Sequence, residues 1–198
     1  MTIIFFDVET TGLLDFKADL MEPHQPRICQ LAAILTEDDG TELEEMNAII
    51  KPDGWVVPEE TAAIHGLTTE RCEADGIPMP EALARFNEMK AKCTARAAYN
   101  ITYDKRMLAR EANLYGIPHD SEGLASHCVM QLARPVCNIA PTDKMMRAGR
   151  KENKPPKLIE AYRHFFGRDF EGAHNAMADV RACKDVFFQI QKLRAVAA

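Results

Sequence analysis

The 198 residues, 46% hydrophobic and 27% charged, suffice for one well-filled core in a globular protein of ordinary composition. The net charge of −6 argues against a protein that coats nucleic acid non-specifically, but still allows a local basic patch to bind a few phosphates. Six scattered cysteines without C-x-x-C spacing argue against structural zinc, and with no apolar run of membrane-spanning length we expect a cytoplasmic protein with reduced thiols.

The first predicted element is a buried strand that ends in two acids. Four apolar residues, Ile3 to Phe6, precede Asp7 and Glu9, whose side chains point to the same face of an extended strand. Two like charges this close oppose each other's ionisation unless a cation lies between them. Taken alone, the pair fits two interpretations equally: a hard-metal site at the carboxyl end of a core strand, or two ordinary surface acids.

The remaining elements follow from turn signals and apolar spacing. Residues 13–25 are predicted to form a loop at the mouth of the site. Further strands are expected at residues 27–36, 41–51, 95–100 and 123–128, the first two joined as a hairpin through an Asp-Gly turn. Helices are expected at residues 58–64, 68–73, 80–92, 102–115 (with Thr102 as N-cap), 129–134, 158–166 and 176–193, and a loop at 138–155. This order predicts an α/β fold, a mixed sheet with helices on its faces, in a single domain over residues 1–198.

Two later segments place further acids near strand or helix ends. Asp104 lies in the first turn of the helix after the fourth strand, where it either joins the site or simply complements the helix dipole. His174 and Asp179 are five residues apart, so both cannot face one site from inside a helix. Both can reach it if His174 lies in the preceding loop, Asn175 caps the helix and Asp179 lies on its inner face. The alternative is a capping loop with an exposed histidine and a solvated acid.

Four motifs, taken in chain order, favour the shared site over the alternative interpretations of these acids. They are F-D-V-E-T-T-G (6–12), I-H-G-L-T (64–68), Y-N-I-T-Y-D (99–104) and H-N-A-M-A-D (174–179). Together they resemble the DEDD superfamily of 3′→5′ exonucleases, in its histidine-containing (DEDDh, DnaQ-like) branch. That family includes the proofreading subunit of bacterial replicative polymerase, oligoribonuclease and ribonuclease T. The resemblance implies a ribonuclease-H-like fold with a central five-stranded mixed sheet flanked by helices. Tyr99 departs from the pattern, since members often carry histidine there.

The resemblance also implies a mechanism with two divalent cations, Mg²⁺ or Mn²⁺ in its place. Asp7 would bridge both ions, Glu9 and Asp179 would complete the ion on the nucleophile side, and Asp104 would hold the other through water. His174 would take the proton from the attacking water, a task that suits a side chain whose unperturbed pKa is about 6.5. The products would be nucleoside 5′-monophosphates.

Substrate contacts come partly from the resemblance and partly from a basic run between Lys144 and Lys157. The backbone amides of Thr10 and Thr11 and the Leu13 side chain are expected to meet the terminal nucleotide. Leu67 is either a wedge against a base or a core residue, and the basic run either follows phosphates or is a solvated loop. Asn100 is more often a tether between loops than a ligand. The candidate substrate-binding residues are Thr10, Thr11, Leu13, His65, Leu67, Asn100, Arg147 and Arg150.

The leading hypothesis is a metal-dependent 3′→5′ exonuclease that acts on single-stranded DNA, for proofreading or trimming. The alternative is an exoribonuclease of the oligoribonuclease or ribonuclease T type, because sugar choice depends on contacts to one 2′-hydroxyl that motifs do not report. A non-catalytic binding module would have lost one of the acids, and none is lost. Only residues 194–198 follow the last predicted helix, which argues against a polymerase-binding tail and leaves a surface contact with a polymerase open.

Overall fold

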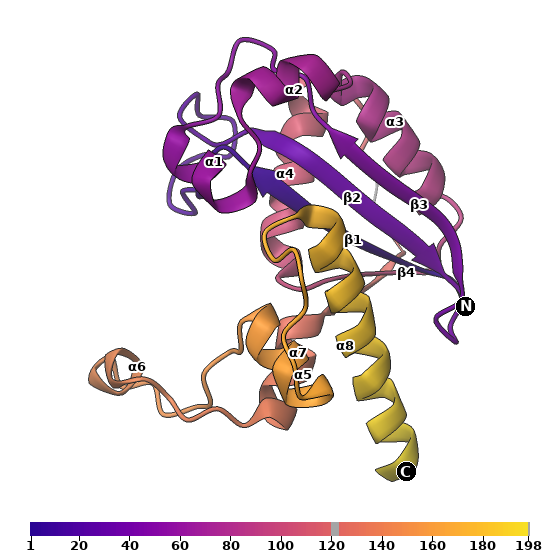
Figure 1. The fold of residues 1–198 in the computed structure, drawn as a ribbon, viewed down its shortest axis with the longest axis vertical. Helices are drawn as coiled ribbons and strands as arrows, with labels where there is room; N and C mark the ends of the chain where they lie inside the picture. Colours follow the sequence, from indigo (N-terminus) through magenta and orange to yellow (C-terminus); the bar gives the residue numbers. More distant parts are fainter. Residues whose placement is uncertain (120–122, 198) are drawn as a thin grey trace.

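A five-stranded mixed sheet with the strand order β3-β2-β1-β4-β5 forms the centre of the computed structural model, which describes residues 1–119 and 123–197 (Figure 1). The strands are β1 (Ile3–Thr10), β2 (Ile28–Thr36), β3 (Glu42–Ile49), β4 (Ala95–Ala98) and β5 (Ala125–Cys128). The helices are α1 (Glu59–His65), α2 (Thr69–Asp75), α3 (Met79–Lys90), α4 (Ile101–Leu114), α5 (Val129–Cys137), α6 (Asp143–Arg147), α7 (Leu158–Phe166) and α8 (Ala176–Ala197). The predicted α/β fold with a five-stranded mixed sheet is confirmed.

The strand directions bring the end of β1 and the start of α4, which carry predicted site residues, to one edge of the sheet. β1 pairs antiparallel with β2, and β2 with β3, so the predicted hairpin is confirmed. β1 runs parallel to β4, and β4 runs parallel to β5. Because β1 and β4 point the same way, the acids that end β1 and the helix α4 that follows β4 meet at the carboxyl edge.

Alternating side chains of β1 build two hydrophobic cores, one on each face of the sheet. Phe6 faces helices α3 and α4 and packs edge-on against Phe86, with ring centroids 5.4 Å apart. Phe5 faces α5, α7 and α8 and packs against Phe187, with centroids 5.3 Å apart. By the same alternation Asp7 and Glu9 continue the Phe5 face, which is the face that α8 covers.

Several boundaries differ from the sequence prediction. Helix α4 begins at Ile101, and Asn100 rather than Thr102 holds the N-cap position without a side-chain cap bond. The predicted loop at 138–155 contains the short helix α6, which begins because the Thr142 hydroxyl accepts a hydrogen bond from the Met145 N–H. All six cysteines carry free thiols, and among the described helices none combines the length and apolar character that crossing a membrane requires.

Candidate active site

The end of β1 carries the first two acids and then bends out of register. Glu9 lies opposite Gln30 on β2, and the pairing shifts by one residue between Glu9 and Thr10. Such a bulge re-aims the strand end, a device that is common beside active sites. After it, the Thr10 hydroxyl hydrogen-bonds the Gly12 carbonyl at 2.8 Å and the Tyr103 hydroxyl at 2.7 Å. Helix α4 therefore fixes the turn that follows the acids.

Asp7, Glu9 and Asp179 form a compact cluster of carboxylates, with one oxygen of each within 4.8 Å of the others. One carboxylate oxygen of Asp179 is buried and accepts no hydrogen bond from the described residues. A buried, unpartnered carboxylate oxygen is costly unless a cation compensates it. An all-oxygen cluster with such an oxygen fits hard divalent cations of the Mg²⁺ type. The residues present therefore fit the divalent metal that the fold implies.

Asp104 approaches the same place from the first turn of α4. Its side chain is 3% exposed and its Oδ1 accepts a hydrogen bond from the Val8 N–H at 3.3 Å. It stands outside the three-carboxylate cluster but lies close enough for its charge to raise the pKa of Asp7. The four acids predicted from the motifs are thus brought together, three in direct proximity and Asp104 beside them.

Burial keeps the acids from ionising together in the protein alone. It raises the pKa of Asp7 well above its usual range, and the charges of Asp104, Asp179 and Glu9 add to the effect. Burial, then the charges of Asp179 and Asp104, raises the pKa of Glu9 to about 7. Burial likewise raises the pKa of Asp104 to about 7 and that of Asp179 to about 6. A bound divalent cation would favour the ionised forms and reverse these shifts.

His174 lies in the loop immediately before α8, as its five-residue spacing from Asp179 required. Its φ of 67° is in the left-handed region, which non-glycine residues rarely adopt and which histidine tolerates better than most. The Asn175 side chain accepts a hydrogen bond from the Ala178 N–H at 3.4 Å and caps the helix. This turn leaves the imidazole exposed at the site while Asp179 points inward from the helix.

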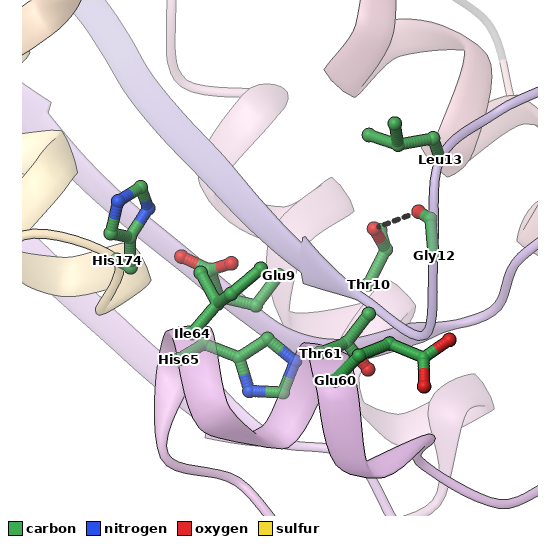
Figure 2. Close-up of a pocket in the computed structure, with 9 residues that line it drawn as sticks. All are labelled: Glu9, Thr10, Gly12, Leu13, Glu60, Thr61, Ile64, His65 and His174. Carbon is green, nitrogen blue, oxygen red and sulfur yellow. Dashed lines mark hydrogen bonds between the residues drawn. The ribbon is translucent and has the colours of Figure 1, made fainter.

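A cavity of about 600 Å³ opens beside the acid cluster. Figure 2 shows Glu9 between the rings of His174 and His65 in this view, with Leu13 across the cavity from His174. The lining residues are Glu9, Thr10, Gly12, Leu13, Glu60, Thr61, Ile64, His65 and His174. The side chain of Leu13 is 91% exposed, so it stands at the rim as an open apolar surface.

Two predicted substrate contacts are contradicted by the structure. Leu67 is 2% exposed and packs in a core cluster with Cys29, Val57 and Cys72, so the core alternative holds and the wedge does not. The Leu67 N–H donates to His65 Nδ1 at 3.2 Å, which positions the His65 ring. The Thr11 N–H donates to the Arg27 carbonyl at 2.9 Å, so that amide is not free for a sugar.

Thr10, Leu13 and His65 line the cavity as predicted, whereas Asn100, Arg147 and Arg150 lie outside the lining. Asn100 is exposed at the start of α4. Arg147 and Arg150 belong to the segment around α6 that projects away from the sheet in Figure 1, and Arg150 pairs with Glu152 at 2.8 Å. Their contact with substrate stays a prediction. Tyr99, the departure from the family pattern, donates its O–H to the Pro156 carbonyl at 2.9 Å and so anchors the segment before α7.

Sequence reasoning predicted His65, the last residue of helix α1, near the substrate but missed the other residues that this helix contributes to the cavity. Glu60, Thr61 and Ile64 line the cavity, and no local pattern marks Glu60 and Thr61 as part of it. It also missed Gln30, which is 2% exposed on a strand whose nine residues are all buried. An amide in the middle of an apolar strand was the available signal, since a buried amide must find partners.

Comparison with known proteins agrees with this geometry. A family model for exonucleases of the RNase T type matches residues 4–187. An uncharacterised exonuclease, CP81, of Escherichia phage 186 is 30% identical over 187 residues, covering 90% of this chain and 82% of that protein.

Solved structures of exonuclease I share the fold. The E. coli enzyme in complex with a dT13 oligonucleotide superposes with a TM-score of 0.76 at 20% identity, over 99% of this chain and 42% of that one. The enzyme from Methylocaldum szegediense gives a TM-score of 0.72 at 21% identity, over 96% and 40%. The chain therefore spans about two fifths of the length of these structures, and the likeness shows the ribonuclease-H-like exonuclease fold.

Proposed function

Since this chain belongs to the RNase T family of DEDD exonucleases, which hydrolyse phosphodiester bonds, we propose that it removes nucleotides from the 3′ end of single-stranded DNA in a metal-dependent reaction. The observation that carries the proposal is the cluster of Asp7, Glu9 and Asp179 beside an open cavity. Similarity in fold to an exonuclease solved with the oligonucleotides dA16 and dT13 supports DNA as the substrate.

The acids have the role of holding divalent cations, Mg²⁺ or Mn²⁺. Asp7, Glu9 and Asp179 are the proposed shared ligand set, and Asp104, whose charge acts on Asp7, would hold a second ion through water. Bound cations would lower the pKa of water and neutralise charge on the scissile phosphate. The Val8 N–H donates to the Asp104 carboxylate, and this bond would keep the proposed ligand in place before substrate arrives.

His174 is the proposed general base. It is exposed at the cavity wall, next to Glu9, where a water attacking the terminal phosphodiester would stand. Its Nδ1 or Nε2 accepts the proton of that water as the oxygen–phosphorus bond forms and the 3′ oxygen of the preceding nucleotide leaves. The product is a nucleoside 5′-monophosphate. No other imidazole in the cavity is as accessible, because His65 is only 9% exposed and already accepts the Leu67 N–H.

The cavity is proposed to receive the 3′-terminal nucleotide. Leu13 and Ile64, which are 91% and 57% exposed, offer apolar surface for the terminal base. Thr10 is engaged with Gly12 and Tyr103, so its side chain shapes the wall rather than reaching for the sugar. A single unpaired strand end fits this arrangement, because a base partner would compete for the same apolar surface.

Digestion of oligonucleotides labelled at the 5′ end tests the proposal. Matched DNA and RNA strands are incubated with Mg²⁺, with Mn²⁺ or with EDTA, and the labelled products are separated by length. We expect a ladder of shortening labelled products from DNA that EDTA abolishes. Release of a labelled mononucleotide first would contradict 3′→5′ polarity, and faster digestion of RNA would contradict the choice of DNA.

A further inference from the structure

The loop between Leu13 and Pro26 is held against helix α4 by hydrogen bonds. The Gln25 side chain is 3% exposed and its amide nitrogen donates to the Asp15 and Asp19 carbonyls at 2.9 and 3.0 Å. Arg110 of α4 donates to three loop carbonyls, those of Leu20, Gln25 and Pro26. These buried contacts fix the conformation of the loop, and they do not involve the residues nearest the cavity.

That loop presents an aromatic ring with a cation beneath it. Phe16 lies three residues after Leu13 and is 52% exposed, and the guanidinium carbon of Arg106 lies 5.1 Å from the centre of its ring. This distance is within the range of a cation–π contact. Three residues span at most about 11 Å, so the backbone of Phe16 lies within that distance of Leu13 at the cavity rim. Leu13 and Phe16 therefore expose apolar surface on one loop beside the site.

Arg106 has no anionic partner among the described residues. Its Nε is buried without a hydrogen-bond acceptor among the described residues. It also takes part in none of the ion pairs found there, whereas Arg27 and Arg163, for example, are paired with Glu111 and Asp169. A guanidinium without an anionic partner beside an exposed ring is suited to a nucleotide, which supplies a π-face and a negative charge together.

We propose that Phe16 and Arg106 form a second nucleotide subsite, which binds the single strand just upstream of the nucleotide in the cavity. A base stacks on the open face of the Phe16 ring, and Arg106 supplies positive charge to the adjoining phosphate. This inference rests on the proposed function and extends it from the terminal nucleotide to the strand behind it. It predicts that longer strands gain affinity that a mononucleotide substrate does not.

The test compares two substrates that differ in whether they reach the subsite. The p-nitrophenyl ester of thymidine 5′-monophosphate occupies the cavity alone, whereas oligodeoxythymidylates of increasing length extend past the rim. We expect Phe16→Ala and Arg106→Gln to lower kcat/KM for the longer strands on the order of tenfold, through KM, since base–aromatic stacking is lost. Hydrolysis of the ester should be unchanged, and Phe16→Tyr should restore binding of the strand.

A matched control is Phe166→Ala, which removes a ring that packs on Tyr162 at 4.4 Å and is 37% exposed on helix α7. It should leave both substrates unaffected. Equal losses on the ester and on the oligonucleotides in Phe16→Ala would assign the ring to loop structure and overturn the subsite, as would unchanged kinetics on both. Failure of the wild-type protein to cleave either substrate would instead overturn the proposed function from which the subsite follows.

Discussion

The Gln30 side-chain oxygen accepts a hydrogen bond from the Ala176 N–H at 3.2 Å, which joins strand β2 to the first residue of helix α8. Gln30 is also the residue paired across the sheet with Glu9, and Asp179 lies one turn into the same helix. Its amide nitrogen donates to Asn47 Oδ1 at 2.8 Å, which fixes the orientation of the amide. One buried amide thereby sets the distance between two acids that are far apart in the sequence.

Replacing this amide is predicted to loosen the site. Gln30→Ala leaves the buried Ala176 N–H without its acceptor, which we expect to cost about 1–3 kcal/mol of unfolding free energy and to lower turnover. Urea unfolding and initial rates with excess Mg²⁺ measure the two effects. Asn47→Ala is the matched control, because it removes the exposed partner and leaves the bond to Ala176. Equal effects of the two variants would contradict the role of the Ala176 bond.

His174 is predicted to act in proton transfer without supporting the fold. His174→Ala should fold and bind Mn²⁺ but lose about two to four orders of magnitude in kcat, which is the usual contribution of a general base. His174→Asn separates chemistry from backbone, since asparagine tolerates the left-handed φ of 67°. Both variants should be equally slow in single-turnover digestion. Near wild-type rates in either would remove the general-base assignment.

The raised pKa values predict how metal and pH act together on stability. In the metal-free protein, the pKa of Glu9 is about 7 and that of Asp179 about 6. Both lie above the values of about 4 in an unfolded chain. Between these values the folded state binds more protons than the unfolded state, so the free energy of unfolding contributed by these groups falls as pH rises from about 4 to about 7.

Differential scanning fluorimetry from about pH 4 to about pH 7, with EDTA and with Mg²⁺, checks the sign of this pH dependence of stability. The rise in Tm that Mg²⁺ produces should grow with pH, because ionised acids bind the cation and no longer repel one another. Asp179→Asn removes one raised group, so its metal-free curve should fall less steeply. A Tm difference that is independent of pH in the wild-type protein would contradict the electrostatic account.

Replacement of Leu67 and replacement of Leu13 are predicted to have opposite effects on stability and on KM. Leu67→Ala should lower the unfolding free energy by about 2–5 kcal/mol, because the side chain is 2% exposed in the core. Leu13→Ala should leave stability unchanged and raise KM, because that side chain is 91% exposed at the cavity rim. Thermal unfolding and steady-state kinetics on one oligonucleotide distinguish the two. A raised KM without destabilisation in Leu67→Ala would restore the wedge interpretation.

The motifs predicted that the four acids lie close together, as they do in the structure, because each acid lies near a strand or helix end, where local sequence signals are strong. The sheet, the hairpin of β2 and β3, and the position of His174 before α8 followed for the same reason. Tertiary contacts decided the rest. The Thr11 N–H donates to the Arg27 carbonyl and is not free for substrate, and Glu60 and Thr61 of helix α1 reach the cavity through packing that no local pattern reports. The polymerase contact, the proofreading role and the cytoplasmic location stay predictions.

The central claim is that the carboxylates at the end of β1 and the start of α8 hold the divalent cations that hydrolysis needs. Calorimetric titration of Mn²⁺ into the folded protein tests it without relying on activity. The wild-type protein and Asp185→Asn, a change on the same helix outside the cluster, should bind Mn²⁺ alike. Asp179→Asn should weaken binding at least about tenfold, as loss of a carboxylate ligand predicts. Unchanged Mn²⁺ affinity in Asp179→Asn would contradict the account.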